Sequence, residues 1–251
     1  QVYRENEDKP PILKAALALQ ATLERMTVTI YDDELIVGNQ GSGLRATTLS
    51  PTVNTWARDE LDKFEERDGS RFLISEQTKR QIREIMPYWE GRNVYDSTMA
   101  MLDQATVDAM DALVFTCGYT LSKGCGHWLL NFETVLKKGF RGIRQAARQK
   151  LSAIDYTDPQ GFEKIPLYQS IIITCDAVKA FAKRYSDLAA KKAAQETQPA
   201  RKAELEQIAQ MCARVPYEAP ETFYEAVQTV YFIQLITQIE SDGTGISPGR
   251  M

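Results

Sequence analysis

Apolar residues recur at helical spacing along most of the chain. After Pro10 and Pro11, residues 12–26 place apolar side chains on one face, the pattern of an amphipathic helix with proline at its first turn. The same spacing predicts helices over residues 54–64, 76–86, 103–117, 132–138, 143–154 and 161–195. Helices therefore dominate the expected structure.

One stretch near the N-terminus departs from this helical pattern. In residues 28–43, VTIYDDELIVGNQGSG, two short apolar runs flank Asp32 and Asp33, and a glycine-bearing loop follows. Short apolar runs rich in β-branched residues and bounded by turn residues are typical of strands. Two short strands around an acidic turn are the predicted structure.

Local signals predict where several helices begin and end. Ser75 is expected to cap the helix over residues 76–86 and Pro87 to stop it, because serine accepts an amide hydrogen bond and proline cannot donate one. Asn131 is expected to cap the next helix and Gly139 to interrupt it. The charge-rich stretch around Pro199 predicts the turn of a helical hairpin.

The last helix is predicted to open at residues 219–221, where proline and a carboxylate suit a helix N-terminus. Its body, FYEAVQTVYFIQLITQI, is apolar on nearly every side, so other elements must enclose it. These patterns support a helix-rich fold, either all-α or α/β.

Composition and charge narrow the function class. The chain has 251 residues with 30 basic and 34 acidic side chains, and no basic block suggests a nucleic-acid or membrane partner. Four spaced cysteines and one histidine cannot form a zinc site, so we expect reduced thiols, no metal and a cytoplasmic location. The N-terminus has no signal-peptide pattern, and the longest uncharged run is too short to span a bilayer.

Residues with candidate chemistry gather in two glycine-bearing stretches. His127 lies in GCGHW, where it either contacts a ligand or simply hydrogen-bonds a loop. Tyr119 and Lys123 would share a face with His127 if the stretch were helical, although a solvated lysine is the simpler interpretation. Asp242 and Thr244 lie in the polar stretch SDGTGISPGR, which either closes a pocket or only connects elements.

A cysteine hydrolase is a further hypothesis, with Cys125 as nucleophile and His127 as base. A separation of two residues makes a well-oriented thiolate–imidazole pair difficult, and no third orienting group is evident. Selective alkylation of Cys125 at neutral pH would support this hypothesis, and uniform slow labelling of all four cysteines would dismiss it.

Four segments, in order, resemble the pyruvate formate-lyase-like glycyl radical enzymes, a group that includes glycerol dehydratase, choline trimethylamine-lyase and hydroxyproline dehydratase. They are DDELIVGNQGS, GHWLLNFETVLKKGF, PETFYEAVQTVYFIQLITQIES and SPGRM. The resemblance implies a ten-stranded α/β barrel in the complete enzyme. Residues 1–251 would form its helix-rich N-terminal portion, without the second half of the barrel or the glycyl radical domain.

The resemblance also implies a radical lyase or dehydratase that acts on a small polar substrate. A radical S-adenosylmethionine activating enzyme would install a glycyl radical, which generates a thiyl radical that abstracts hydrogen from the substrate without a bound cofactor. The family's radical glycine and catalytic cysteine are expected downstream of Met251, so the fragment has no catalytic residue of its own and none of its four cysteines takes that role. We expect the complete enzyme to be a homodimer in the cytoplasm of an anaerobic cell.

Two pocket elements follow from the resemblance. His127 matches a substrate-contacting histidine of the glycerol dehydratase-like members, and Tyr119 and Lys123 lie where substrate contacts vary. Dehydratases commonly read Asn-Gly-His-Ser after the last helix, whereas this sequence has Asp242 and Thr244 in a stretch reading Asp-Gly-Thr-Gly. The departure argues against glycerol or propanediol as substrate.

A hypothesis of another class is a stand-alone helical binding or scaffold module without catalysis. The apolar helix over residues 223–239 argues against it, because a free-standing chain would have to cover that helix without the rest of a barrel.

Overall fold

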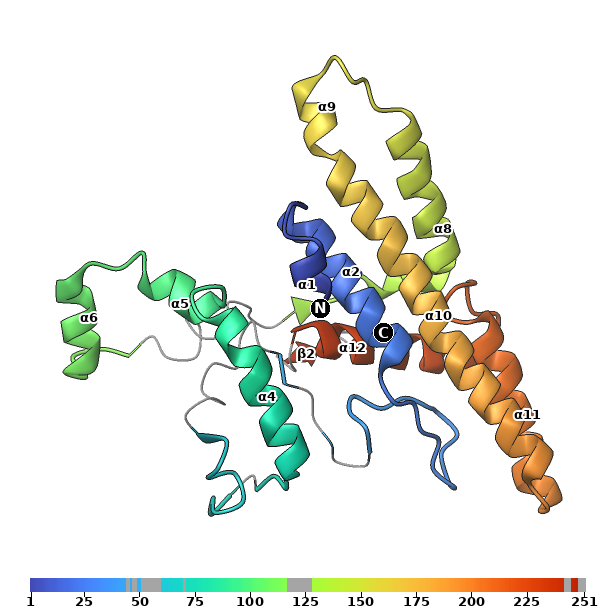
Figure 1. Ribbon diagram of the computed structural model, residues 1–251. Coiled ribbons are helices and arrows are strands. Elements are labelled where there is room, and N and C mark those ends of the chain that lie inside the picture. The colour runs from blue at the N-terminus through green and yellow to red at the C-terminus, as the bar shows by residue number, and fades with distance from the viewer. Residues whose placement is uncertain are drawn as a thin grey trace. The chain divides into compact units, whose positions relative to one another are not determined.

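The computed structural model describes residues 1–43, 46, 49–50, 60–69, 71–116, 128–241 and 245–247. The chain divides into two compact units, which are drawn in Figure 1. Unit 1 combines Gln1–Thr47 with Leu129–Met251, and unit 2 is Thr48–Trp128. None of the helices in the described part of the chain has the length and apolar character needed to cross a membrane.

Unit 1 is built around one long helix, α10 (Ile165–Gln195), against which its neighbours α2, α8 and α11 pack (Figure 1). Its other elements are α1 (Val2–Glu5), α2 (Pro11–Arg25), α8 (Phe132–Ser152), α9 (Pro159–Glu163), α11 (Pro199–Arg214), α12 (Phe223–Ser241) and β2 (Ile246–Ser247). The predicted hairpin is confirmed, because α10 ends at Gln195 and α11 begins at Pro199.

The core of unit 1 is contributed by α2, α10, α11, α12 and the segment of residues 27–41. Phe181, Tyr185 and Phe232 form its aromatic centre, with ring centroids 5.2–5.8 Å apart. Aliphatic side chains surround these rings, including Leu23, Ile30, Val37, Ile208 and Val215. Burial of this apolar surface is the main source of stability for the unit.

Gly139 interrupts α8, as predicted. Its φ of 60° and ψ of 173° are not helical, and the turn lets Phe140 N donate to Pro216 O at 3.0 Å and Arg141 N to Tyr217 O at 2.8 Å. Asn131 also caps α8 as predicted, since its Oδ1 accepts a hydrogen bond from Thr134 N at 3.1 Å.

The predicted strands within residues 28–37 are wrong. Asp32 and Asp33 form the expected turn, but the runs on either side are extended without a strand partner among the described residues. Side chains from α10, α11 and α12 hydrogen-bond the backbone of this segment instead. Such contacts can satisfy the backbone groups that a sheet would otherwise pair.

Unit 2 contains α4 (Glu76–Trp89), α5 (Val94–Met99) and α6 (Gln104–Asp111), and β1 (Trp128–Leu129) lies at its C-terminal boundary. Ser75 caps α4 as predicted, because its Oγ accepts from Thr78 N at 3.1 Å. Pro87 does not stop α4, which runs on to Trp89: the missing N–H removes one hydrogen bond in the last turn only. α6 ends before Leu113, whose φ of 57° leaves the helical region, so the predicted extension to residue 117 is wrong.

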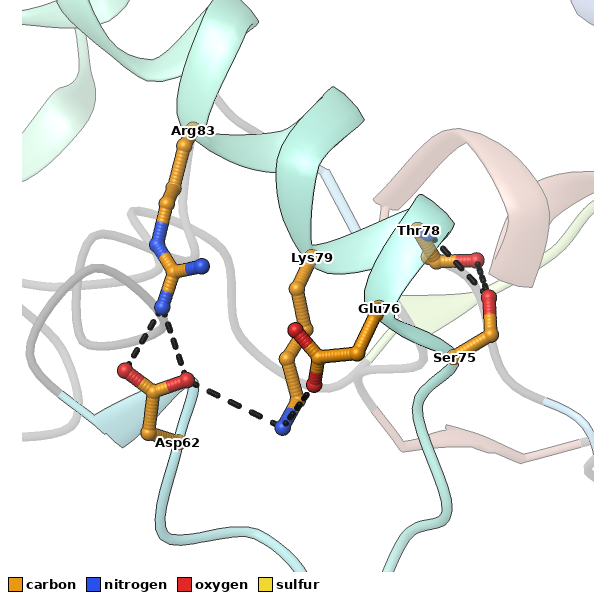
Figure 2. A network of polar contacts seen from close by, with 6 residues as sticks. All are labelled: Asp62, Ser75, Glu76, Thr78, Lys79 and Arg83. Atoms are coloured by element: carbon orange, nitrogen blue, oxygen red, sulfur yellow. Dashed lines mark hydrogen bonds and ion pairs between the residues drawn. The ribbon is translucent and has the colours of Figure 1, made fainter.

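The helix predicted over residues 54–64 falls mostly outside the described residues, and Leu61 to Phe64 lie in turns. These turns are tied to α4 by an ion-pair network (Figure 2). Asp62 accepts hydrogen bonds from Arg83 at 2.6 and 2.7 Å, and its carboxylate lies 3.7 Å from Lys79 Nζ. Lys79 also pairs with Glu76 at 3.0 Å. The hydrogen bond from Arg83 lowers the pKa of Asp62, so the network contributes while Asp62 is ionised.

Candidate functional site

The predicted substrate-binding residues lie outside the part of the chain that the structure describes. They are Tyr119, Lys123, His127, Asp242 and Thr244. Two short described strands adjoin them in sequence, because β1 begins immediately after His127 and β2 begins two residues after Thr244. The roles of these five residues stay predictions.

β1 and β2 pair with each other in a two-stranded sheet. Paired strands lie about 5 Å apart, so this pairing joins segments that are far apart in the sequence. Ile246 of β2 is buried, and its carbonyl accepts a hydrogen bond from Gln234 Nε2 on α12 at 3.4 Å. β2 is therefore held against α12 by burial and by one polar contact.

The start of α8 packs on the same helix. Phe132 and Val135 form a buried cluster with Ile233 of α12, and Leu130 packs against it from the residues that follow β1. The cap from Asn131 fixes the first turn of α8 beside this cluster. Apolar packing thus anchors the chain on the C-terminal side of β1 to α12.

Three polar side chains of α12 hydrogen-bond the extended segment of residues 35–38. Gln228 Nε2 donates to Val37 O at 2.8 Å, and Gln228 Oε1 accepts from Val37 N at 2.9 Å. Tyr231 Oη donates to Gly38 O at 3.1 Å. Tyr224 Oη donates to Leu35 O. The amide of Gln228 therefore takes the place that a neighbouring strand would have in a sheet.

A second set of hydrogen bonds holds this segment from the side of α10. Asn39 N donates to Tyr185 Oη at 2.9 Å, and Tyr185 Oη donates in turn to Asn39 Oδ1. Asn39 Oδ1 also accepts from Thr29 N at 3.0 Å, and Asn39 Nδ2 donates to Thr27 O at 3.1 Å. Burial raises the pKa of the Tyr185 phenol, which therefore stays protonated as a donor.

Basic side chains bind the carbonyls at the other end of the segment. Lys192 Nζ donates to Ile30 O at 2.6 Å, and Arg201 donates to Tyr31 O at 2.9 Å and to Glu34 O at 3.0 Å. Burial raises the pKa of Glu34, although its carboxylate accepts from Tyr31 N at 2.9 Å. Residues 27–41 are consequently held in place by side chains along most of their length.

Glu240 is the titratable group at the C-terminal end of α12. Desolvation raises the pKa of its carboxyl, even though the side chain reaches solvent. A carboxyl in this setting keeps its proton at a higher pH than an ordinary glutamate. It lies two residues before Asp242 in the sequence.

The cysteines and acidic residues of the described part offer little other chemistry. Cys175 and Cys212 are buried, and burial raises the pKa of each thiol to about 12, so neither is a reactive nucleophile. Cys117 and Cys125 lie outside the described residues. Among the described histidine, cysteine, aspartate and glutamate side chains, no group of three or more could hold a metal ion.

The sequence patterns missed the residues that hold the segment of residues 27–41, namely Asn39, Tyr185 and Gln228. Gln228 carried a usable signal, because an uncharged polar side chain inside an apolar helix needs a buried partner. That partner is a backbone 191 residues away in the sequence, which no local pattern identifies.

Comparison with known proteins gives one family for the whole chain. The family model described as pyruvate formate lyase-like matches residues 1–251. A probable dehydratase, YbiW, from Escherichia coli strain K12 is 34% identical over 252 residues, which cover all of this chain and 31% of that protein. An isethionate sulfite-lyase from Oleidesulfovibrio alaskensis is 38% identical over 259 residues, covering 99% of this chain and 31% of the relative.

The fold agrees with that similarity. The glycerol-bound B12-independent glycerol dehydratase from Clostridium butyricum matches 99% of this chain with a TM-score of 0.95 at 36% identity, and the match covers 32% of the dehydratase. The chain thus spans under a third of the length of these relatives.

Proposed function

The chain belongs to the pyruvate formate lyase-like family, and from this membership we propose that the full-length protein is a glycyl radical lyase acting on a small polar substrate. The predicted fold class is confirmed, because the helix-rich chain matches part of the larger fold of glycyl radical enzymes. The observation that carries the proposal is a TM-score of 0.95 with glycerol dehydratase at 36% identity over nearly the whole chain.

The proposal includes the finer reaction class and its partners. Cleavage of a carbon–oxygen or other carbon–heteroatom bond fits relatives named as dehydratases and as isethionate sulfite-lyases. A radical S-adenosylmethionine activating enzyme would install the glycyl radical on the full-length protein, which we propose to be a cytoplasmic homodimer. No other cofactor is needed for hydrogen abstraction by a thiyl radical.

We propose that two groups of residues contact the substrate, namely His127, Tyr119 and Lys123, and Asp242 and Thr244. The pairing of β1 with β2 supports this grouping, because each strand adjoins one set in the sequence. Thr244 and Gly245, where dehydratases have a histidine and a serine, favour a substrate other than glycerol or 1,2-propanediol.

Anaerobic reconstitution tests the proposal. The full-length protein and its activating enzyme are incubated with S-adenosylmethionine, and electron spin resonance is expected to show a glycyl radical. Glycerol, isethionate and trans-4-hydroxy-L-proline are then offered as substrates, together with amino alcohols and hydroxy acids. A protein that forms no glycyl radical would remove the proposed function.

His127→Ala separates a binding role from a structural one. We expect turnover to fall by about a hundredfold or more while the radical yield stays intact, because misplaced substrate loses the benefit of orientation. Loss of radical and turnover together would mark His127 as structural. Asn131→Ala, which removes only the cap of α8, is the control and should leave kcat/KM within about threefold of wild type.

The stand-alone module remains the second hypothesis, and one observation favours it. Within unit 1 the chain itself buries Phe232, Ile236 and Ile239 of the apolar helix to 8% exposure or less. These three side chains of α12 are therefore buried without the rest of a barrel.

A further inference from the structure

The rotation and axial register of helix α12 need a cause beyond apolar burial. Its side chains are apolar on nearly every side, and Phe232, Ile233, Leu235 and Ile236 are all buried. Apolar contacts are non-directional, so they stabilise the helix without strongly selecting its rotation or its axial register. Polar contacts have to supply that selection.

The side chains of α12 that hydrogen-bond the segment of residues 27–41 form a single stripe. Tyr224, Gln228 and Tyr231 are spaced i, i+4 and i+7, so they share one face of the helix. In the same order they bind carbonyls that advance along the extended segment, from Leu35 through Val37 to Gly38. A shift of α12 by one residue would rotate this face by about 100° and break all three contacts.

Of the three residues in the stripe, Gln228 would lose the most hydrogen bonds if the helix were displaced. Its side chain is fully buried, and its two hydrogen bonds satisfy both the N–H and the C=O of Val37. A register that separated the two residues would leave four buried polar groups unpaired, and each costs more than a typical hydrogen bond gains. A single buried amide fixes helix register in coiled coils for the same reason.

The segment cannot simply follow a displaced α12. Tyr185 on α10 holds Asn39, and Lys192 and Arg201 hold the carbonyls of Ile30 and Tyr31. Gly38 also lies so close to α12 that an added Cβ would come within 2.7 Å of Leu235 Cδ2. The segment therefore acts as a fixed reference for the helix.

We propose that Gln228 is a positioning residue that sets the register of α12 and, through Gln234 and Ile246, the placement of β2. α12 and β2 flank Asp242 and Thr244 in the sequence. The inference rests on the proposed function in assigning those two residues to substrate binding. The fixing of the α12 register by Gln228, called the register lock below, is independent of any substrate.

Hydrogen exchange in the full-length protein without the radical tests the lock. Gln228→Met keeps the size of the side chain and removes the amide. We expect exchange of the Val37 amide to rise by about a hundredfold, and that of Ile246 and Ser247 by about tenfold, because the lost contacts permit local opening. Faster exchange at Val37 alone would confine the effect of Gln228 to its own contact and overturn the proposal.

Thr229→Val is the matched control. Thr229 follows Gln228 in the same helix and is equally buried, but its hydroxyl has no hydrogen-bond partner among the described residues. Replacing it by an apolar side chain of the same shape should leave exchange at Ile246 and Ser247 unchanged. Acceleration equal to that of Gln228→Met would mean that any change in this helix has the effect, and the proposal would fail.

Kinetics of the activated enzyme then test positioning, using whichever of glycerol, isethionate and trans-4-hydroxy-L-proline the wild type converts. Gln228→Met should lower kcat/KM by about tenfold to a hundredfold, mainly through kcat, with the radical yield intact, because a misplaced substrate loses the benefit of orientation. Unchanged kcat/KM would overturn the positioning role. If Gln228→Met does not fold, Tyr231→Phe, which removes only the contact with Gly38, should show the same pattern at smaller size.

A protein that forms no radical would remove the proposed function and leave the exchange experiment valid. Normal radical formation and turnover with no coupled exchange at β2 would remove the register lock alone.

Discussion

Gly139 illustrates how a single residue decides a packing arrangement. Its backbone lies in the left-handed region at φ 60°, and a Cβ at this position would come within 2.4 Å of Tyr217 O. The chain before α12 can approach α8 this closely only because the position has no side chain. The two backbone hydrogen bonds to Pro216 and Tyr217 depend on the same approach.

We therefore expect Gly139→Ala to lower the free energy of unfolding by about 3 kcal/mol, since backbone strain and the steric clash both contribute. Urea denaturation followed by circular dichroism measures the change. Gly43→Ala is the control, because a Cβ at Gly43 would meet no atom of the described residues within 4 Å. Equal stability of the two variants would contradict the role given to Gly139.

Glu225 caps the start of α12 and makes its stability depend on pH. Desolvation raises the pKa of its carboxyl, but hydrogen bonds from Glu221 N at 2.7 Å and from Arg214 at 3.0 Å, with attraction to that guanidinium, outweigh it and lower the pKa below 4.5. A lowered pKa in the folded state contributes stability above the unfolded pKa, and this is lost as pH falls through the folded pKa.

Glu225→Gln is expected to cost about 1 kcal/mol at pH 7 and progressively less as pH falls through the lowered folded pKa of Glu225, because below that pKa both proteins are uncharged at this position. Chemical denaturation between pH 7 and pH 3 gives the difference. A constant difference across this range would show that the charge of Glu225 is irrelevant.

Glu34→Gln is a control for Glu225→Gln, because the pKa of Glu34 is shifted in the opposite direction. Burial raises the pKa of its carboxyl, so ionised Glu34 costs stability once pH rises through the raised pKa. Glu34→Gln keeps an acceptor for Tyr31 N and should leave the protein as stable as wild type at pH 7, or slightly more stable.

At the scale of elements, a bidentate ion pair between Arg144 and Asp176 joins α8 to α10. Arg144 Nε donates to Asp176 Oδ1 at 2.8 Å, and a terminal nitrogen donates to Asp176 Oδ2 at 2.9 Å. The hydrogen bond to Asp176 raises the pKa of Arg144, so the guanidinium keeps its charge. The guanidinium is mostly buried between the two helices, whereas Asp176 is partly exposed.

Arg144→Lys should lower stability by about 1 kcal/mol, because an ammonium group cannot make both parallel hydrogen bonds to one carboxylate. Thermal unfolding at low and high salt is the measurement, and screening by salt should reduce the difference only slightly. Arg148→Lys, at an exposed position of the same helix, should be neutral. An equal loss in both variants would attribute the effect to helix propensity.

At the scale of the whole molecule, the 251 residues correspond to less than a third of each relative's length and leave large apolar side chains exposed. Phe223 is 86% exposed and Leu129 is 75% exposed in unit 1. Exposed apolar surface of this kind commonly marks contact with another protein segment.

We predict that the 251-residue chain alone binds a hydrophobic dye strongly and elutes from size-exclusion chromatography as associated species. The full-length protein should bind the dye about tenfold less, because its additional segments cover apolar surface. A compact, dye-silent monomer of the 251-residue chain would instead favour the stand-alone module.

The sequence alone determined the helices whose apolar stripes and end signals are local. α2, the capped start of α8, its break at Gly139 and the turn between α10 and α11 all depend on residues within a few positions of each other. The family was also recognisable, because its four segments are contiguous stretches of sequence. The apolar periodicity predicts these helices because a helix pairs its backbone groups within its own residues.

Tertiary structure alone decided the state of residues 27–41. The same apolar runs suit a strand or an extended segment, and the outcome depended on whether partners came from another strand or from side chains. Tyr185 and Gln228 supply those partners from 146 and 191 residues away. An extended segment cannot satisfy its own backbone groups, so its partners, and with them the register of α12, exist only once the chain has folded.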